Sequence, residues 1–290
     1  MFQGSFVAIV TPFKDDGSID MAAFEALIDF HLEEGTDGLV PCGTTGETPT
    51  LSKDEKKQLI QKTIEKAKGK LPIIAGTGSY NTKETVEMTK WAADAGADAA
   101  LVVTPYYNKP TCKGLLSHFE AIAKATDLPI VLYNVPSRTS LNMTPQVVRE
   151  LAAIPSVKAI KEASGNLSQV MEIAATTDLT ILSGDDNLTL PILSVGGKGV
   201  ISVSANIIPK EMSQLVKYYL EGKTEEARKL ALKIFHLCQS LFLETNPIPV
   251  KKALELMGKI GPTLRLPLAP MDEGLAEKLK TAMKDFGLLK

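Results

Sequence analysis

The sequence predicts an α/β fold, a (β/α)8 barrel followed by a C-terminal helical extension. Eight short runs rich in valine and isoleucine recur along the 290 residues, at the spacing of about 20 to 35 residues that is typical of β/α units. The runs are continuously apolar, which is typical of parallel strands covered on both faces. Helical patterns lie between them and supply the crossovers that parallel strands require. Eight units imply a sheet that closes into a barrel.

The eight predicted strands each end in turn residues. They cover residues 5–10, 38–41, 72–75, 99–104, 129–133, 157–161, 179–183 and 199–203. A doubly wound open sheet is the structural alternative. The early Gly-x-Gly-x-x-Gly motif expected of that fold is absent, and eight repeats are more than it usually contains. The barrel is therefore the preferred interpretation.

The predicted helices carry their own start signals. Ser52 and Glu55 have the spacing of a capping box, and Thr144 precedes Pro145 at a first helical position. After the eighth strand only helical patterns follow, over residues 209–220, 224–243, 249–257 and 273–286. We therefore expect a catalytic barrel over residues 1–222 and a helical region over residues 223–290. No low-complexity linker separates the two, so we expect the helical region to pack on the barrel.

Composition excludes several functional classes. The formal net charge is −2, from 32 basic and 34 acidic residues, so nothing indicates binding to nucleic acid or to an anionic membrane. Cys42, Cys112 and Cys238 lie far apart, which predicts neither a disulfide framework nor a zinc ribbon and favours a cytoplasmic location. The first apolar run is interrupted at Thr11-Pro12 and lacks a basic flank, so we expect neither a signal peptide nor an anchor. The three histidines stand singly, so no metal site is predicted.

Polar and glycine residues gather where the predicted strands end. In a (β/α)8 barrel the chemistry lies at the C-terminal ends of the strands. The segments at those ends are residues 42–47, 76–78, 104–108, 133–139, 161–162 and 184–186. The sequence therefore predicts one polar rim.

Lys161 ends the sixth predicted strand. Alternation places Ala159 and Lys161 on one side of that strand and Lys158 and Ile160 on the other, with Lys158 toward water. A lysine in an apolar barrel mouth loses hydration, which favours the free amine. A free amine attacks a carbonyl, and the resulting imine is an electron sink. The alternative is a lysine that reaches solvent or pairs with Glu162.

Three hydroxyl groups converge on Lys161 in this interpretation. Imine chemistry requires repeated proton transfers, which the phenol of Tyr133 can perform from the neighbouring strand end. Thr44 and Tyr107 extend it into a hydroxyl chain. A single tyrosine at such a position is more often a packing residue, but three hydroxyls beside one lysine favour catalysis.

Two further segments are suited to carboxylates. The threonines of Gly43-Thr44-Thr45-Gly46-Glu47 and the adjacent N–H groups suit a small carboxylate. A simple strand-to-helix turn explains the glycines but not both threonines. Arg138 can bind a second carboxylate through two parallel hydrogen bonds, although a lone loop arginine is usually solvated.

Together, five segments in this order resemble the dihydrodipicolinate synthase family, and the resemblance covers essentially the whole chain. They are GTTGE at 43–47, TPYYN at 104–108, YNVPSRT at 133–139, IKEASGN at 160–166 and NPIPVK at 246–251. The resemblance implies a lyase of the class I aldolase type that condenses pyruvate with L-aspartate 4-semialdehyde. The product is 4-hydroxy-tetrahydrodipicolinate, which enters lysine and diaminopimelate biosynthesis. No external cofactor is implied.

The resemblance also implies site residues and an assembly. By position, Lys161 forms the Schiff base with pyruvate and Tyr133 is the general acid and base. Thr44 and Tyr107 complete a proton relay, with Tyr107 reaching in from a neighbouring subunit of a homotetramer built as two dimers. The remaining implied residues contact the substrates: Thr45 binds the pyruvate carboxylate, Ile201 lines the pyruvate site and Arg138 binds the semialdehyde carboxylate.

Several alternatives and departures remain. N-acetylneuraminate lyase and 2-keto-3-deoxy sugar-acid aldolases share the superfamily, but Arg138 favours a substrate with a carboxylate. A catalytically silent sensor of pyruvate-like acids and a purely structural oligomer module are alternatives from other classes. Ser140 replaces the glycine that is usual in the family. Lysine-inhibited members have histidines and an asparagine where this chain has Lys53, Lys56 and Tyr80, so we expect weak or absent inhibition by L-lysine.

Overall fold

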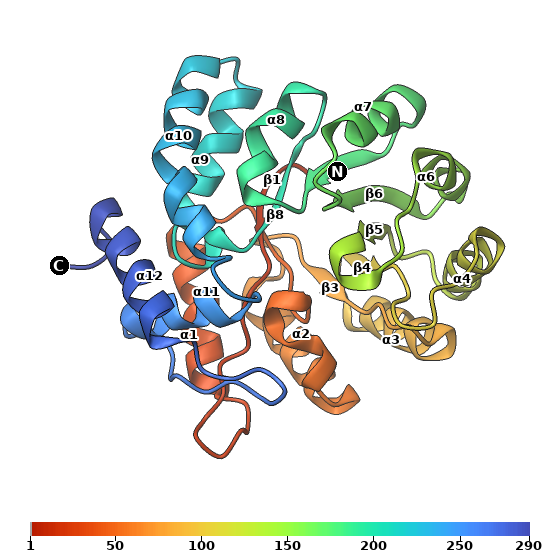
Figure 1. Ribbon diagram of the computed structural model, residues 1–290. Coiled ribbons are helices and arrows are strands. Elements are labelled where there is room, and N and C mark those ends of the chain that lie inside the picture. The colour runs from red at the N-terminus through yellow and green to blue at the C-terminus, as the bar shows by residue number, and fades with distance from the viewer. Residues whose placement is uncertain (1) are drawn as a thin grey trace.

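The computed structural model describes residues 2–290 and contains one sheet of eight parallel strands ringed by helices (Figure 1). The strands are β1 (Gly4–Val7), β2 (Gly38–Leu39), β3 (Ile74–Gly76), β4 (Ala99–Val103), β5 (Ile130–Asn134), β6 (Val157–Glu162), β7 (Thr180–Ser183) and β8 (Gly199–Ser202). They follow the order β2-β1-β8-β7-β6-β5-β4-β3. A parallel bridge between Leu39 and Ile73 joins the two ends of that order. The predicted barrel is confirmed.

Helices alternate with the strands and cover the outside of the barrel (Figure 1). They are α1 (Met21–Glu33), α2 (Lys53–Ala67), α3 (Thr82–Ala95), α4 (Cys112–Ala125), α5 (Pro136–Thr139), α6 (Pro145–Ala152), α7 (Leu167–Thr176), α8 (Thr189–Ser194), α9 (Pro209–Leu220), α10 (Thr224–Ser240), α11 (Ile248–Leu256) and α12 (Glu273–Phe286). Short 3-10 turns are η1 (Thr44–Gly46), η2 (Thr48–Thr50), η3 (Asp186–Leu188) and η4 (Ser204–Asn206). In the described part of the chain, none of the helices has the length and apolar character needed to cross a membrane.

The predicted signals for helix starts are found at the N-termini of α2 and α6. The Ser52 side chain accepts from the backbone of Glu55, whose carboxylate accepts in return, so both bonds of the capping box are formed. Thr144 caps α6, and Pro145 occupies its first turn. The second strand is shorter than predicted and ends at Leu39. Backbone hydrogen bonds from Val40 N–H to Val7 O and from Gly76 N–H to Pro41 O continue the contact with β1 and β3, and the chain then turns at Cys42, which has a φ of 58°.

The core has two layers, one inside the barrel and one between the sheet and the helices. Ala159 packs in the inner cluster and Ile160 in the outer cluster, while Lys158 is exposed. This alternation is the one expected from the sequence. Lys161, two residues after Ala159, therefore points into the barrel.

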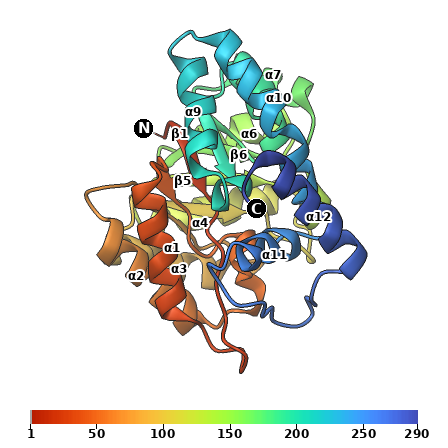
Figure 2. The same cartoon turned by 90° about the vertical axis from the view of Figure 1, so that its left-hand side faces the viewer.

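The last helices lie together on one side of the barrel (Figures 1 and 2). Helix α10 packs against α9 and α12, and α11 packs against α12. Helix α10 ends at Ser240, three residues before the predicted end, because the chain turns there toward the barrel mouth. The division of the chain between residues 222 and 223 stays a prediction.

Candidate active site

A cavity of about 510 Å³ lies at the C-terminal ends of the strands, and we call it the barrel-mouth cavity. Its lining combines the predicted rim residues with residues of the C-terminal region. The lining residues are Thr44, Thr45, Tyr133, Val135, Ser137, Arg138, Lys161, Ala163, Gly184, Asp185, Asn187, Val203, Gln239, Phe242 and Asn246. Five of the seven predicted site residues thus share one cavity. No group of three His, Cys, Asp or Glu side chains within residues 2–290 is placed to hold a metal ion.

Lys161 lies at the base of this cavity with only 5% of its surface exposed. Strands β5 and β6 pair Tyr133 with Lys161, and the lysine Nζ lies 4.3 Å from the centroid of the tyrosine ring. No carboxylate of residues 2–290 lies within 4.0 Å of that Nζ. Both alternatives for Lys161, solvation and pairing with Glu162, are therefore wrong. The amine is buried, has no counter-ion and faces open space.

The carboxylate of Glu162 forms hydrogen bonds on the face of β6 opposite Lys161. Its Oε1 accepts from the backbone N–H of Ser164 at 2.7 Å, and its Oε2 accepts from Asn134 Nδ2 at 3.0 Å and Gln169 Nε2 at 3.3 Å. Asn134 also accepts from the backbone of Met143 at 2.9 Å. These bonds fix the ends of β5 and β6 immediately beyond the reactive pair. This network was not predicted from the sequence. Alternation along β5 and β6 nevertheless places Asn134 and Glu162 on the opposite faces of these strands from Tyr133 and Lys161.

The threonines lie on η1, above the end of β2. Thr45 Oγ1 accepts a hydrogen bond from Asn246 Nδ2 at 3.0 Å. The backbone N–H groups of Thr44 and Thr45 donate to no other group in residues 2–290. Thr44 and Tyr133 also line a second, smaller cavity of about 30 Å³. The turn therefore presents unused donors to the cavity, as expected for a carboxylate site.

Arg138 lies on α5, a single turn that the sequence analysis did not predict. Its Nη2 donates to the backbone oxygen of Asn246 at 3.0 Å. Ser140 ends α5 in the left-handed region at a φ of 54°. That conformation explains why glycine is suited to the position, since serine adopts it at a steric cost. The replacement leaves Arg138 in the cavity wall.

Two predicted residues are not part of this cavity. Tyr107 is 91% exposed, stands at a φ of 64° and does not line the cavity. Ile201 is fully buried inside the barrel in the same cluster as Tyr133. The predicted roles of both residues stay predictions.

Several cavity residues were not singled out from the sequence. Burial raises the pKa of Asp185 above its ordinary value, which favours the neutral acid. Gln239, Phe242 and Asn246 come from the C-terminal region, for which only packing was expected. The segment NPIPVK, which contains Asn246, is the one sequence signal that pointed to them. Gly184 leaves room beside the end of β6, because a Cβ there would lie 2.6 Å from the Cβ of Ala163 and 3.2 Å from the Cε of Lys161.

Known proteins resemble this chain over its full length. A sequence model of the dihydrodipicolinate synthetase family matches residues 1–286. The 4-hydroxy-tetrahydrodipicolinate synthase of Thermodesulfovibrio yellowstonii is 52% identical, with 100% of each chain covered. The dihydrodipicolinate synthase of Thermotoga maritima superposes with a TM-score of 0.97 at 45% identity, again over 100% of each chain. The chloride-inhibited enzyme of Acinetobacter baumannii complexed with pyruvate has a TM-score of 0.97 and 46% identity over 100% of each chain. The chain belongs to the dihydrodipicolinate synthetase family.

Proposed function

We propose that this protein condenses pyruvate with L-aspartate 4-semialdehyde through a Schiff base on Lys161. The observation that carries the proposal is the buried Nζ of Lys161, which faces the barrel-mouth cavity beside Tyr133 without a counter-ion. Relatives that share about half of the sequence are named as this synthase. A sensor protein or a structural module would need no buried amine beside a phenol.

The first step forms the imine. The free amine of Lys161 attacks the carbonyl carbon of pyruvate, and water leaves from the carbinolamine. Loss of a proton from the methyl group then gives an enamine. The nucleophilic carbon of the enamine attacks the aldehyde carbon of the semialdehyde, and the aldehyde oxygen takes up a proton. The amino group of the bound adduct then attacks the imine carbon, which closes the ring and releases the amine of Lys161.

Tyr133 is the proposed proton carrier, because these steps need a proton to be taken and returned. Thr44 shares the cavity with it and is placed to pass protons onward. Thr45 and the N–H groups of η1 are the proposed site for the pyruvate carboxylate, and the guanidinium of Arg138 for the carboxylate of the semialdehyde. Ile201, buried in the same cluster as Tyr133, is proposed to line the pyruvate end. Asp185 is an additional polar wall residue.

We further propose a cytoplasmic homotetramer, built from two dimers in which Tyr107 completes the neighbouring subunit's proton relay. The exposure of Tyr107 supports this, as does an edge-to-face pair between Tyr80 and Tyr106 nearby. Mixing Lys161→Met protomers with Tyr107→Phe protomers tests the trans arrangement. A mixed dimer then contains one intact site, so activity above that of either variant alone is expected. No recovery after subunit exchange would contradict it.

A side-by-side initial-rate assay tests the reaction itself. Pyruvate plus L-aspartate 4-semialdehyde is expected to turn over, whereas pyruvate plus N-acetylmannosamine is not. The amino sugar has no carboxylate for Arg138, whereas the semialdehyde does. Turnover of the amino sugar alone would favour the lyase instead.

A further inference from the structure

We propose that the NPIPVK segment (residues 246–251) is a positioning element that holds the GTTGE segment (residues 43–47) so that the Thr45 hydroxyl donates to the carboxylate of pyruvate. The proposal rests on the function proposed above and deepens it. Asn246, at the start of the segment, is the residue that sets the direction of the Thr45 hydroxyl. Lys251, at its end, anchors the other side of the same turn.

The contact at Asn246 determines the role that the Thr45 hydroxyl can take. Asn246 Nδ2 donates to Thr45 Oγ1, so the threonine oxygen is an acceptor in this bond and its own hydrogen points elsewhere. No group of residues 2–290 accepts that hydrogen. Thr45 is buried and lines the cavity, so a substrate carboxylate is the acceptor that its position allows. A hydrogen bond to a charged oxygen is stronger than one to a neutral group.

The same residue links the two proposed carboxylate sites. The backbone oxygen of Asn246 accepts from Arg138 Nη2, while its side chain holds Thr45. Asn246 is buried, and its Oδ1 has no hydrogen-bond partner. One backbone unit therefore fixes the guanidinium and the hydroxyl relative to each other.

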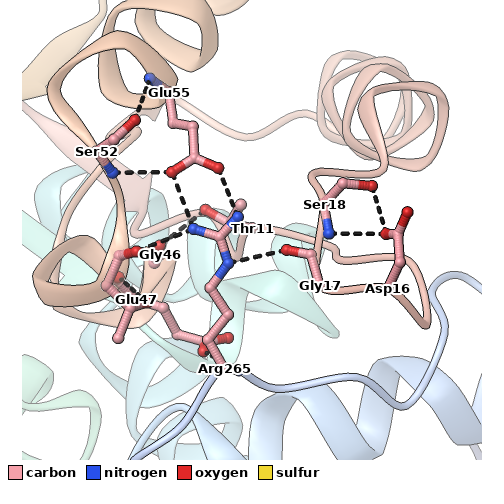
Figure 3. A network of polar contacts seen from close by, with 10 residues as sticks. Thr11, Asp16, Gly17, Ser18, Gly46, Glu47, Ser52, Glu55 and Arg265 are labelled. Atoms are coloured by element: carbon pink, nitrogen blue, oxygen red, sulfur yellow. Dashed lines mark hydrogen bonds and ion pairs between the residues drawn. The ribbon is translucent and has the colours of Figure 1, made fainter.

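Lys251, at the end of the NPIPVK segment, binds Glu47 at the end of the GTTGE segment. Its Nζ donates to Glu47 Oε1 at 2.6 Å, and both side chains are at most 2% exposed. Glu47 stands at a φ of 55°, immediately after the turn that carries Thr45. Figure 3 shows Glu47 beside Arg265, whose backbone N–H donates to the second oxygen of Glu47 at 3.1 Å. The left-handed residue is thereby held at both carboxylate oxygens, and the turn before it is fixed.

Arg265 connects this anchor to α2. Its guanidinium forms two hydrogen bonds to the Glu55 carboxylate, and Nε donates to the backbone oxygen of Gly17 (Figure 3). Its Nη1 also donates to the backbone oxygen of Thr50, at the end of η2. Lys251 and Arg265 of the C-terminal region thus form hydrogen bonds with both the GTTGE segment and the η2 turn that follows it.

The substitution Asn246→Asp tests the direction of the Thr45 hydroxyl. Aspartate has nearly the same shape but only accepts, so the Thr45 hydroxyl must turn to donate to it and is lost to the substrate. The readout is the pyruvate concentration at which borohydride traps half of the protein, because trapping reports pyruvate binding without the second substrate. We expect this concentration to rise about tenfold or more. At saturating pyruvate and semialdehyde we expect kcat to change far less.

A double-mutant cycle separates positioning from the added negative charge. In a Thr45→Val background the hydroxyl is absent, so Asn246→Asp should raise the half-trapping concentration by less than about twofold further. Asn187→Asp is the matched control, because it adds the same charge to the cavity wall without contacting Thr45. Its effect should persist in the Thr45→Val background. If Asn246→Asp does not fold, Asn246→Ala replaces it, with a smaller rise that also vanishes in that background.

Two results would overturn the inference. A trapping curve for Asn246→Asp that matches the wild type would mean that Thr45 already donates to residue 246. An effect of equal size with and without the Thr45 hydroxyl would mean that charge alone acts. Failure of the wild-type protein to trap pyruvate at all would instead remove the proposed function, and this inference with it.

Discussion

Two lysines are buried among residues 2–290. Each Nζ lies over an aromatic ring, but the hydrogen-bond partners of the two differ. Lys251 Nζ donates to Glu47 Oε1 at 2.6 Å, to Thr11 O at 3.0 Å and to Thr263 O at 2.7 Å. Burial lowers the pKa of Lys251, and the Glu47 carboxylate opposes that shift. Lys161 has no such acceptor among residues 2–290 and faces a tyrosine ring and a cavity. Three acceptors fix the side chain of Lys251 in a structural role, whereas Lys161 has no such partners and its Nζ is left for a substrate in the cavity.

Lys161→Met should produce the largest effect. The substitution removes the nucleophile but keeps an unbranched chain of similar size, so we expect kcat to fall on the order of 10⁴-fold with little change in thermal stability. Initial rates and a melting curve measure the two quantities. Substantial residual turnover would mean that Lys161 is not the nucleophile.

Tyr133→Phe should follow, with a fall in kcat of about 10²- to 10⁴-fold because one general acid and base is lost. The ring that packs against Lys161 remains, so the fold should be unchanged. Rates at saturating substrates, compared with the midpoint of thermal unfolding, check this. Wild-type turnover in a folded variant would reduce Tyr133 to a packing residue.

Lys251→Met should act on stability instead. It leaves the Glu47 carboxylate buried and unpaired, which costs about 3–5 kcal/mol in the free energy of unfolding. Glu47→Gln combined with Lys251→Met removes both charges and should recover much of that loss. Lys252→Met, which breaks a more exposed pair with Glu255, should cost less than about 1 kcal/mol. Denaturant unfolding of the three variants provides the ranking, and equal losses at positions 251 and 252 would contradict it.

His31 is a third buried basic side chain, and its burial favours the neutral imidazole. Burial lowers the pKa of His31 from 6.5 to about 3, with a smaller contribution from the charge of Lys259. Between those values the unfolded chain binds a proton that the folded chain does not. The free energy of unfolding should therefore fall as the pH decreases through this window, by at most about 1.4 kcal/mol per pH unit. Denaturant unfolding at pH 7 and pH 5 should show a smaller difference in His31→Gln than in the wild type.

Lysines that line a second cavity should give the smallest effect. Lys53 and Lys56 line a separate cavity of about 520 Å³ with Lys83, Glu84 and Glu87. Three ammonium groups near this cavity oppose a cationic ligand, so L-lysine should inhibit weakly or not at all. Initial rates with added L-lysine measure this, and half-inhibition at submillimolar concentration would contradict it. Lys53→His with Lys56→His removes both fixed charges at neutral pH and should increase any inhibition.

The barrel could be predicted from sequence because its signals are local. A continuous apolar run such as that before Lys161 indicates a strand without knowledge of its neighbours, and Ser52 with Glu55 indicates a helix start. Rim residues followed from the same strands, since parallel strands end at one rim. Alternation also placed Lys161 on the same side of its strand as Ala159, opposite Lys158 and Ile160. This part of the site was therefore predictable from the order of elements alone.

Contacts between distant parts of the chain were not predictable in this way. Asn246 meets Thr45 across 201 residues, and Lys251 meets Glu47 across 204. No periodicity encodes such pairs, because they depend on where the chain turns after α10. The resemblance to a family drew attention to NPIPVK but not to its contacts. Tyr107 is a different case, since the role expected of it requires a second subunit.

Reductive trapping tests the central difference between the two buried lysines most directly. The protein is incubated with pyruvate, reduced with borohydride and digested. The masses of the peptides that contain Lys161 and Lys251 are then measured by mass spectrometry. One reduced pyruvate should appear on Lys161 and none on Lys251. An adduct on Lys251, or no adduct on Lys161 in the folded protein, would contradict this account.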